Sequence, residues 1–236
     1  MPKKRSQEEY KKIWELSTIW NVLTDEEKEY VDNYVSVHRF RKNEIIHHEG
    51  DIPTHMMMLA EGKVRVYKEG VSNRNQIIRL LKPYDFFGYR AIIANDGNGY
   101  NTSVSAFEES LVYMVKKDAF LHLIQTNLEF CYLVMVEMAR DLGHSDTRSV
   151  NLTQKHIRGR LAEALISLQQ RYGYDEDEAT IAMYMSREDL ANLSNMTTSN
   201  AIRTLSNFAE EGLISIDGRK IKILDMQRLS KLSQHG

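Results

Sequence analysis

The spacing of apolar residues is helical near the N-terminal end of this 236-residue chain. Residues 8 to 34 are predicted to form short helices, because apolar residues such as Ile13 and Trp20 fall on one helical face. Thr24 and Glu27 have the spacing of a capping box, in which each side chain accepts a hydrogen bond from the other residue's backbone. A second helix is therefore expected to begin after Thr24.

The pattern changes at Val37, where short apolar runs of strand composition begin to follow one another. Turn signals rich in Gly, Pro, Asn and Asp separate these runs. The runs are Ile45–Ile46, Met56–Leu59, Val64–Tyr67, Ile77–Leu81, Val104 and Leu111–Val115. Many short strands at this spacing predict an antiparallel sandwich or barrel.

Helical spacing returns after Lys117 and continues to about Tyr172. One stripe within it repeats at steps of four and three residues, which predicts a helix of several turns. The stripe consists of Phe130, Val134, Met138, Leu142, Ser145, Ser149 and Leu152. Such a stripe can pack on its own domain, but a helix this long has more apolar edge than a small β-domain covers. We therefore expect it to pack against the same helix of a second subunit, as in a coiled coil.

Two short helices joined by a tight turn are predicted towards the C-terminal end. Ser186 is a good N-cap for the first, with Asp189 three positions later. Thr197 or Thr198 caps the second helix, and Gly212 ends it as a left-handed C-cap. The buried side of the second helix is expected to consist of Ala201, Ile202, Leu205 and Phe208.

The opposite side of this second helix has the chemistry that DNA recognition requires. Its outward residues are Thr198, Ser199, Asn200 and Arg203. Short hydroxyl and amide groups near the start of a helix can bind phosphates or base edges, and an arginine one turn later can bind a guanine with two hydrogen bonds. A DNA-contacting role is therefore expected for these residues, together with Ser186, Arg187 and Thr197 near the two helix starts.

A basic hairpin follows, with Asp217–Gly218 as its turn signal. Arg219, Lys220 and Lys222 are placed at its tip and along one flank, where they can contact backbone phosphates. Helix, turn, helix and basic hairpin together predict a winged helix-turn-helix that binds DNA. The alternative is a winged helix that contacts only proteins.

Composition limits the class of protein. Hydrophobic content of 42% and charged content of 27% are ordinary for a soluble globular protein. No apolar run approaches the roughly 20 residues of a membrane span, and the basic start Met1–Ser6 does not lead into an apolar signal core. A cytoplasmic protein is expected. The single cysteine, Cys131, excludes an internal disulfide framework and an iron–sulfur cluster held by several thiolates.

The small net charge of the chain limits the ways in which it can contact DNA. A net charge of −2 excludes a polybasic coat, so any contact with DNA must come from a local arrangement of residues. Asp175–Glu178 gathers four acids in one segment. We expect this segment to be a solvated loop, with a metal site as the alternative.

In this order and spacing, the chain resembles the superfamily of the cAMP receptor protein and the fumarate–nitrate reductase regulator (CRP/FNR), over about residues 23–224. The segments that carry the resemblance are Ile45–Asp51, Met58–Tyr67, Tyr84–Arg90, Met138–Leu142, Gly159–Ala162 and the helix-turn-helix. The resemblance implies a double-stranded β-roll, a dimerising helix, a hinge near residues 155–157 and an effector pocket that biases the DNA-binding domains.

The pocket positions depart from the pattern of members that bind cyclic nucleotides. Those members follow the pocket glycine, here Gly88, with a glutamate, where this chain has Tyr89. Their Arg-Ser pair for the cyclic phosphate matches Tyr100 and Asn101. Without an arginine there, a buried phosphate loses its charge-assisted partner. We therefore expect no cAMP binding.

Four further residues bear on the pocket that the resemblance implies. Arg90 is close in sequence but displaced by two positions, and Thr102 follows the two matched residues. Ser145 and Asp146 on the long helix occupy the places of pocket hydroxyls, and the Asp146 carboxylate would repel a phosphate. The cysteine cluster of the oxygen-sensing branch is absent from the N-terminal region.

The predicted fold class is α+β, with three domains. These are an N-terminal β-roll effector domain over residues 1–127, a dimerisation helix over residues 128–154 and a winged helix-turn-helix over residues 155–236. Expected partners are a double-stranded DNA operator, a second copy of the chain, RNA polymerase and an unidentified small-molecule effector. No cofactor, metal, membrane contact or catalytic residue is predicted.

Two alternatives remain open. One is a haem or redox sensor on the same fold, using one of the eight histidines or Cys131. The other is a cupin-type metalloenzyme, suggested by the cluster of His47, His48, Glu49 and His55. Metal ligands on one strand need a spacing of two, and His47 and His48 are adjacent, so at most one of them faces the interior.

Overall fold

The computed structural model describes residues 10–70 and 75–235. The segment Met1–Ser6 and the first two residues of the helical region predicted at 8–34 lie outside the described residues. The chain forms two compact units. The first comprises Met1–Glu69 and Ile78–Leu142, and the second comprises Gly70–Ile77 and Gly143–Gly236. The domain boundaries expected after residues 127 and 154 stay a prediction.

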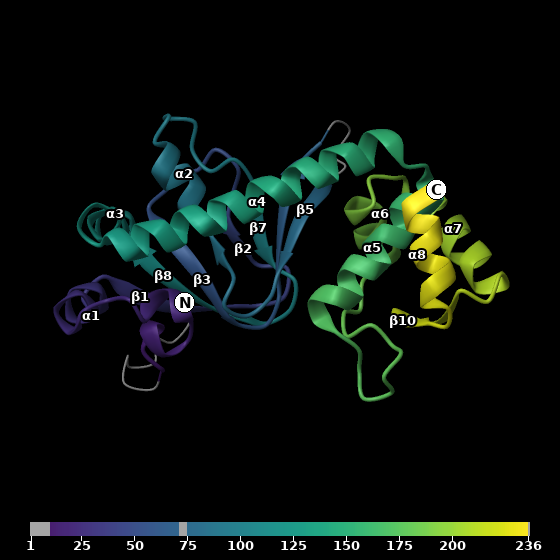
Figure 1. The fold of residues 1–236 in the computed structure, drawn as a ribbon, viewed down its shortest axis with the longest axis horizontal. Helices are drawn as coiled ribbons and strands as arrows, with labels where there is room; N and C mark the ends of the chain where they lie inside the picture. The colour runs from purple at the N-terminus through teal and green to yellow at the C-terminus, as the bar shows by residue number, and fades with distance from the viewer. Residues whose placement is uncertain (1–9, 71–74, 236) are drawn as a thin grey trace. The chain divides into compact units, whose positions relative to one another are not determined.

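The first unit begins with short helical turns (Figure 1). They are η2 (Ile13–Glu15), η3 (Thr18–Trp20) and α1 (Asp25–Asp32). The predicted capping box is confirmed, because the Glu27 N–H donates to Thr24 Oγ1 at 3.2 Å and the Thr24 N–H donates to Glu27 Oε2 at 2.8 Å. Ile13 and Trp20 are both buried, so these turns cover part of the core.

Two four-stranded sheets build the β-roll, in the orders β1-β8-β3-β6 and β2-β7-β4-β5. The strands are β1 (Val35–Phe40), β2 (Ile45–His47), β3 (His55–Glu61), β4 (Val64–Glu69), β5 (Asn75–Leu81), β6 (Phe86–Phe87), β7 (Ser103–Ala106) and β8 (Ser110–Lys116). Each predicted apolar run falls within one of them. The α+β fold with an antiparallel roll is thereby confirmed, and β1, β6 and helix α2 (Tyr89–Ala94) are additions.

Residues on the two faces of β3 belong to two different cores. Met56 and Met58 pack with α3 (Lys117–Thr126) and the N-terminal turns, whereas Met57 and Leu59 pack with residues of β4 and β7 inside the roll. Successive side chains of a strand point to opposite faces of its sheet. Because both faces of β3 are covered, its sequence is a continuous apolar run without alternation.

The long helix α4 spans Leu128–Gln154, and its N-terminal half lies along the roll (Figure 1). The prediction that its whole stripe faces a partner helix is wrong, because Phe130 and Val134 are buried in the core of their own unit. Leu142, Ser145 and Ser149 of the same stripe are exposed, with Leu142 at 63%. The roll therefore takes up the first turns of the stripe.

The second unit consists of helices and a small hairpin. The elements are α5 (Ile157–Tyr172), α6 (Arg187–Leu193), α7 (Thr198–Glu210), β9 (Ile214–Asp217), β10 (Lys220–Ile223) and α8 (Met226–His235). The brief strand predicted at residues 180–183 is not formed. Only isolated bridges occur there, from Tyr174 to Ile181 and from Thr180 to Lys222, because the segment follows β10 for too short a distance.

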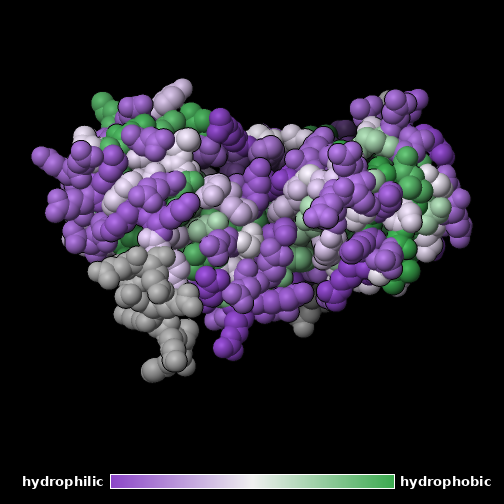
Figure 2. Space-filling view, turned by 90° about the horizontal axis from the view of Figure 1, so that it is seen from below, coloured by the Kyte–Doolittle hydropathy of each residue, from purple (hydrophilic) through white to green (hydrophobic). Residues whose placement is uncertain are grey.

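Among the described residues, no single helix has the length and hydropathy of a membrane span, although the bent pair α3 and α4 passes this test of length and composition. The same residues contain no group of three or more His, Cys, Asp or Glu side chains arranged to hold a metal. Hydrophilic residues cover most of the face in Figure 2, with apolar residues in small separate patches.

Candidate nucleic-acid interface and β-roll interior

Helices α6 and α7 are each started by a side-chain cap. The Asp189 N–H donates to Ser186 Oγ at 3.0 Å, and the Asn200 N–H donates to Thr197 Oγ1 at 3.3 Å. Thr197, and not Thr198, therefore caps α7. These bonds satisfy backbone donors that a helix start leaves without intrahelical partners. Gly212 follows α7 with a φ of +69°, as its predicted C-cap role requires.

The two sides of α7 differ sharply in burial. Ala201, Leu205 and Phe208 are buried as predicted, and Thr204 is buried with them. The prediction for Ile202 is wrong, because its side chain is 48% exposed. Successive residues of a helix are about 100° apart around its axis. This rotation places Ile202 beyond the edge of the buried arc, which is centred on Phe208, and close to the direction of Ser199.

The outward side of α7 is polar and open. Thr198, Ser199 and Arg203 are exposed, and Asn200 is half-buried. Arg203 Nη2 donates to Asn200 Oδ1 at 2.7 Å, so the guanidinium is held back along its own helix. The four outward residues of the prediction thus lie together on the first two turns of α7, where their donors can reach a base edge or a phosphate.

The hairpin β9–β10 forms the predicted wing, with Gly218 and Arg219 as its two-residue loop. Arg219 and Lys220 are exposed, and Lys220 Nζ lies 5.6 Å from the centre of the Tyr184 ring. Arg187 Nη2 donates to the Gly218 carbonyl at 3.0 Å. Arg187, predicted as a DNA contact, therefore also connects the start of α6 to the tip of the wing.

Arg160 is a positioning residue that the sequence reasoning missed. Its guanidinium donates to the carbonyls of Ser194 at 3.1 Å and Asn195 at 3.2 Å, which belong to the turn between α6 and α7. Arg148 on α4 donates to the nearby Leu193 carbonyl at 3.1 Å. Both arginines bind carbonyl groups at or just after the end of α6. The signal available in the sequence was Arg160 itself, which lies in the Gly159–Ala162 motif.

The interior of the β-roll is filled by its own side chains. Tyr100 and His47 are both buried, and their rings stack with centroids 3.8 Å apart. The Tyr100 hydroxyl donates to the His55 carbonyl at 2.9 Å. Burial lowers the pKa of His47 to about 4, and its Nε2 has no hydrogen-bond partner among the described residues. A neutral imidazole in an aromatic stack leaves no charge here for a phosphate.

Gly88 lies next to this stack in the left-handed region, at a φ of +79°. A Cβ at this position would lie 2.7 Å from Met57 Cε and 3.3 Å from Tyr100 Cε1. Gly88 and Tyr100, two of the predicted pocket residues, are therefore in close proximity. The glycine gives close packing inside the roll.

Tyr89 and Arg90 gather instead around Asp141 on α4. The Tyr89 hydroxyl donates to Asp141 Oδ2 at 2.8 Å, and Arg90 Nη1 lies 3.9 Å from the same oxygen. Arg79 of β5 forms an ion pair with the other oxygen. Burial, with the Asp141 charge as a second cause, raises the pKa of Tyr89 well above its usual range. This Asp141 cluster, which consists of Arg79, Tyr89, Arg90 and Asp141, was not predicted.

The remaining pocket residues are not part of either group. Asn101 is exposed and Thr102 is half-buried, and both lie just before β7. Ser145 belongs to the second unit, where it is exposed on α4 and its carbonyl accepts from the Ser149 hydroxyl at 3.0 Å. The assignment of these residues to an effector pocket stays a prediction.

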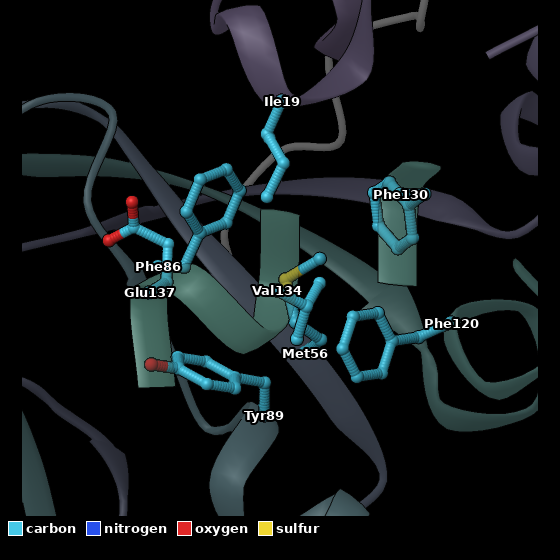
Figure 3. A pocket seen from close by; sticks show the side chains of 8 residues that line it. All are labelled: Ile19, Met56, Phe86, Tyr89, Phe120, Phe130, Val134 and Glu137. Carbon is cyan, nitrogen blue, oxygen red and sulfur yellow. The ribbon is translucent and has the colours of Figure 1, made fainter. Parts of the chain in front are cut away.

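Figure 3 shows a small apolar pocket outside the roll interior. It is partly open to solvent and is lined by Ile19, Met56, Phe86, Tyr89, Phe120, Phe130, Val134 and Glu137. Its polar groups are few, because the Tyr89 hydroxyl is bonded to Asp141 and the Glu137 carboxylate is paired with Arg140. The arrangement offers no set of convergent polar groups that would orient a ligand.

The residues of the haem and metalloenzyme alternatives are dispersed. His47 is the last residue of β2 and is buried, whereas His48, which follows the strand, is exposed. Thr54 and the half-buried His55 lie beside each other, with Oγ1 and Nδ1 at 2.9 Å. Cys131 is a half-buried free thiol on α4.

Two family models match this chain. A cyclic nucleotide-binding domain matches residues 37–127, and a Crp-like helix-turn-helix domain matches residues 159–232. The first match covers the roll and α3, and the second covers α5 to α8 with the wing.

Known proteins with similar sequences are transcription regulators. A CRP-like cAMP-activated global transcriptional regulator of Mycobacterium tuberculosis is 24% identical over 193 residues, covering 81% of this chain and 85% of that protein. Transcriptional regulator LdrP of Thermus thermophilus is 25% identical, covering 82% and 94%.

Solved structures show the same fold. FixK2 from Bradyrhizobium japonicum has a TM-score of 0.74 at 24% identity, covering 84% of this chain and 96% of that chain. A putative transcriptional regulator of the crp/fnr family from Eubacterium rectale has a TM-score of 0.76 at 19% identity, covering 92% and 98%. The β-roll, long helix and helix-turn-helix are thus shared with these structures.

Proposed function

Because this chain belongs to the CRP/FNR superfamily of transcription regulators, we propose that it is a sequence-specific regulator that binds its operator as a homodimer and does not respond to cAMP. The observation that carries the proposal is the open polar face of α7 beside a basic wing. That face presents Ser199 and Arg203 to solvent, with Thr197 engaged as the helix cap.

The roles of these groups on DNA follow from their positions. Arg203 would give up its bond to Asn200 and donate two hydrogen bonds to a guanine edge. The released Asn200 amide would then be available to a base or a phosphate. Arg219 and Lys220 on the wing would neutralise phosphates. A chain with a net charge of −2 gains modest affinity from each such set. Two sets on half-sites one helical turn apart would supply the rest.

The direct test is the selection of bound duplexes from a random DNA pool by the full chain. A two-fold-symmetric motif is expected, with half-sites separated by about one helical turn. A selected site without symmetry would overturn the homodimeric part of the proposal. Failure to enrich any duplex would overturn sequence-specific binding.

A seam for the homodimer is available on the outer side of α4. In the part of α4 that belongs to the first unit, the exposed large apolar residues are Leu128, Tyr132, Met135 and Leu142, with exposures of 83, 61, 54 and 63%. The steps between them are four, three and seven residues, which is the heptad spacing of a coiled-coil seam. Burial of these side chains against a second copy would remove the largest exposed apolar surface of the helix.

The seam is tested by Met135→Glu, which places a charge at its centre and is expected to convert a dimer into a monomer in sedimentation experiments. Ile52→Glu is the matched control, since Ile52 is 81% exposed in the loop between β2 and β3 and far from the seam in sequence. Equal effects of the two substitutions would contradict the assignment of the seam.

The absence of a cAMP response is supported by the closed roll. Tyr100 stands at the position matched to the phosphate-binding arginine, and its ring is packed on His47. Cyclic AMP is therefore expected to change neither the melting temperature nor the operator affinity of the full chain. A saturable shift in either quantity would overturn this part of the proposal. Operator-dependent transcription in vitro tests the direction of regulation and RNA polymerase as a partner. The same measurement tests a small-molecule effector.

A further inference from the structure

Ile202 is a large aliphatic residue on the side of α7 that faces away from the core. It is 48% exposed, whereas Ala201, Leu205 and Phe208 on the other side are buried. Its nearest neighbours along the outward side are Ser199 one turn earlier and Ser206 one turn later, both exposed and polar. The apolar side chain thus lies among groups that are suited to base edges.

Nothing in the fold of α7 calls for an isoleucine at this position. Isoleucine is a weaker helix former than alanine or leucine, because its branched side chain loses rotamer freedom in a helix. About half of its side-chain surface is open to solvent, unlike that of the residues in the buried arc of the helix. Single exposed aliphatic residues are common on protein surfaces, so exposure alone decides nothing. The informative fact is its location between Ser199 and Arg203 in the segment matched by the Crp-like helix-turn-helix model.

The major groove offers one apolar group to such a side chain. The C5 methyl of thymine projects into the groove and distinguishes an A·T pair from the other pairs through apolar contact. A branched aliphatic side chain has no donor or acceptor and therefore prefers this methyl to any polar base edge. We propose that Ile202 is a specificity-determining residue that reads a thymine methyl in each half-site. This inference rests on the proposed function and adds a base identity to it.

The position of Arg203 sets where that thymine should be. Adjacent residues on a helix point about 100° apart, so Ile202 and Arg203 address neighbouring parts of the groove. The thymine is therefore expected within about two base pairs of the guanine that Arg203 contacts. A selected motif should contain both bases in each half-site.

The experiment uses the duplex that the wild-type full chain selects from a random pool. Each thymine is replaced in turn, in both half-sites, by deoxyuridine, which lacks only the C5 methyl. Affinity is measured by fluorescence anisotropy for the wild type, for Ile202→Ala and for Leu224→Ala. Leu224 is the matched control, because it is 52% exposed and lies on the loop before α8.

At one thymine position, deoxyuridine is expected to weaken wild-type binding about fourfold per half-site, the value of one buried methyl group. Ile202→Ala should bind the thymine duplex about as weakly as the wild type binds the deoxyuridine duplex, and should show no further loss there. Leu224→Ala should respond like the wild type. Because Ile202 is exposed and alanine favours helices, the melting temperature of Ile202→Ala should not fall.

Two failures are distinguishable. If the wild type selects a motif but Ile202→Ala responds to every deoxyuridine as the wild type does, this inference is overturned and the proposed function stands. If the wild type enriches no duplex, both are overturned.

Discussion

The interior of the β-roll and the outer side of α7 differ in whether their polar groups are buried or exposed to solvent. Inside the roll, Tyr100 and His47 are stacked and buried, and the tyrosine hydroxyl already has its acceptor. On α7, Ser199 and Arg203 face solvent, and the Arg203 guanidinium donates to Asn200 of the same helix. The first region is a completed core and the second is a surface with unused binding capacity. Substitutions in the roll should therefore change stability, and substitutions on α7 should change affinity.

The largest effect is expected for Tyr100→Ala. Removal of a buried aromatic side chain leaves a cavity and typically lowers the free energy of unfolding by about 3–5 kcal/mol. Tyr100→Phe keeps the ring and loses the two bonds of the hydroxyl, which donates to the His55 carbonyl at 2.9 Å and accepts from the His55 N–H at 3.4 Å, so its cost should be about 1–2 kcal/mol. Urea unfolding followed by tryptophan fluorescence measures this selectively, because both tryptophans, Trp14 and Trp20, belong to the first unit. Equal stabilities of wild type and Tyr100→Ala would show that the interior is not a packed core.

Acid should destabilise the roll through His47. Its pKa is about 4 in the folded chain and about 6.5 when exposed, so the unfolded state binds more protons between these values. Stability from this group is fully present above pH 6.5 and is lost as the pH falls towards 4, by about 3 kcal/mol.

The variant His47→Phe keeps an aromatic ring but has no proton to bind. Its free energy of unfolding should depend less on pH than that of the wild type in this window, with the difference growing as the pH falls. The tryptophan signal of the first unit is again the measurement. Identical pH profiles would show that His47 is accessible to protons, and the roll would then not be closed.

The double substitution of Ser199 and Arg203 by alanine should lower operator affinity about a hundredfold while leaving stability unchanged. A good two-bond contact with a base contributes about 1–3 kcal/mol, so the two Arg203 contacts of a dimer, at the lower end of this range and with a smaller share from Ser199, account for a hundredfold loss. The measurement is anisotropy on the selected duplex. Lys42→Ala controls for the lost positive charge, since Lys42 is an exposed cation of the roll. Unchanged affinity of the double variant would remove the basis of the proposed function.

Thr197→Ala should give the smallest effect, a destabilisation of α7 by about 1 kcal/mol through loss of its cap. This destabilisation should appear as a roughly fivefold faster hydrogen exchange of the α7 amides that exchange through local opening. Ser206→Ala is the matched control, because an exposed mid-helix serine caps nothing and alanine favours the helix. If Thr197→Ala weakened operator binding far more than it loosened α7, Thr197 would be a DNA contact beyond its capping role.

Local patterns in the sequence predict a large part of this fold. The capping box at Thr24, the caps at Ser186 and Thr197 and the C-cap at Gly212 each depend on residues within a few positions, and the structure contains all of them. The apolar runs locate six of the eight strands of the roll for the same reason. The exposed polar side of α7 follows from its buried side through helical geometry alone.

Features that depend on distant residues were missed. The apolar stripe that begins at Phe130 gives no sign of whether the roll or a partner covers it, and the roll covers its first part. Ile202 has the hydropathy of a core residue, and only the exact direction of α7 on its neighbours exposes it. The Asp141 cluster joins residues from three separate segments, which no spacing rule connects.

This last cluster constrains how the chain can change over evolutionary time. The Asp141 side chain is only 12% exposed and has charged partners on β5 and α2. Loss of Arg79 alone would leave a poorly hydrated carboxylate without its nearest counter-charge, a costly intermediate for a lineage to pass through. Positions 79 and 141 should therefore be replaced together among descendants of this sequence, and a change of residue at position 89 should be tolerated only where it can still serve the same acceptor.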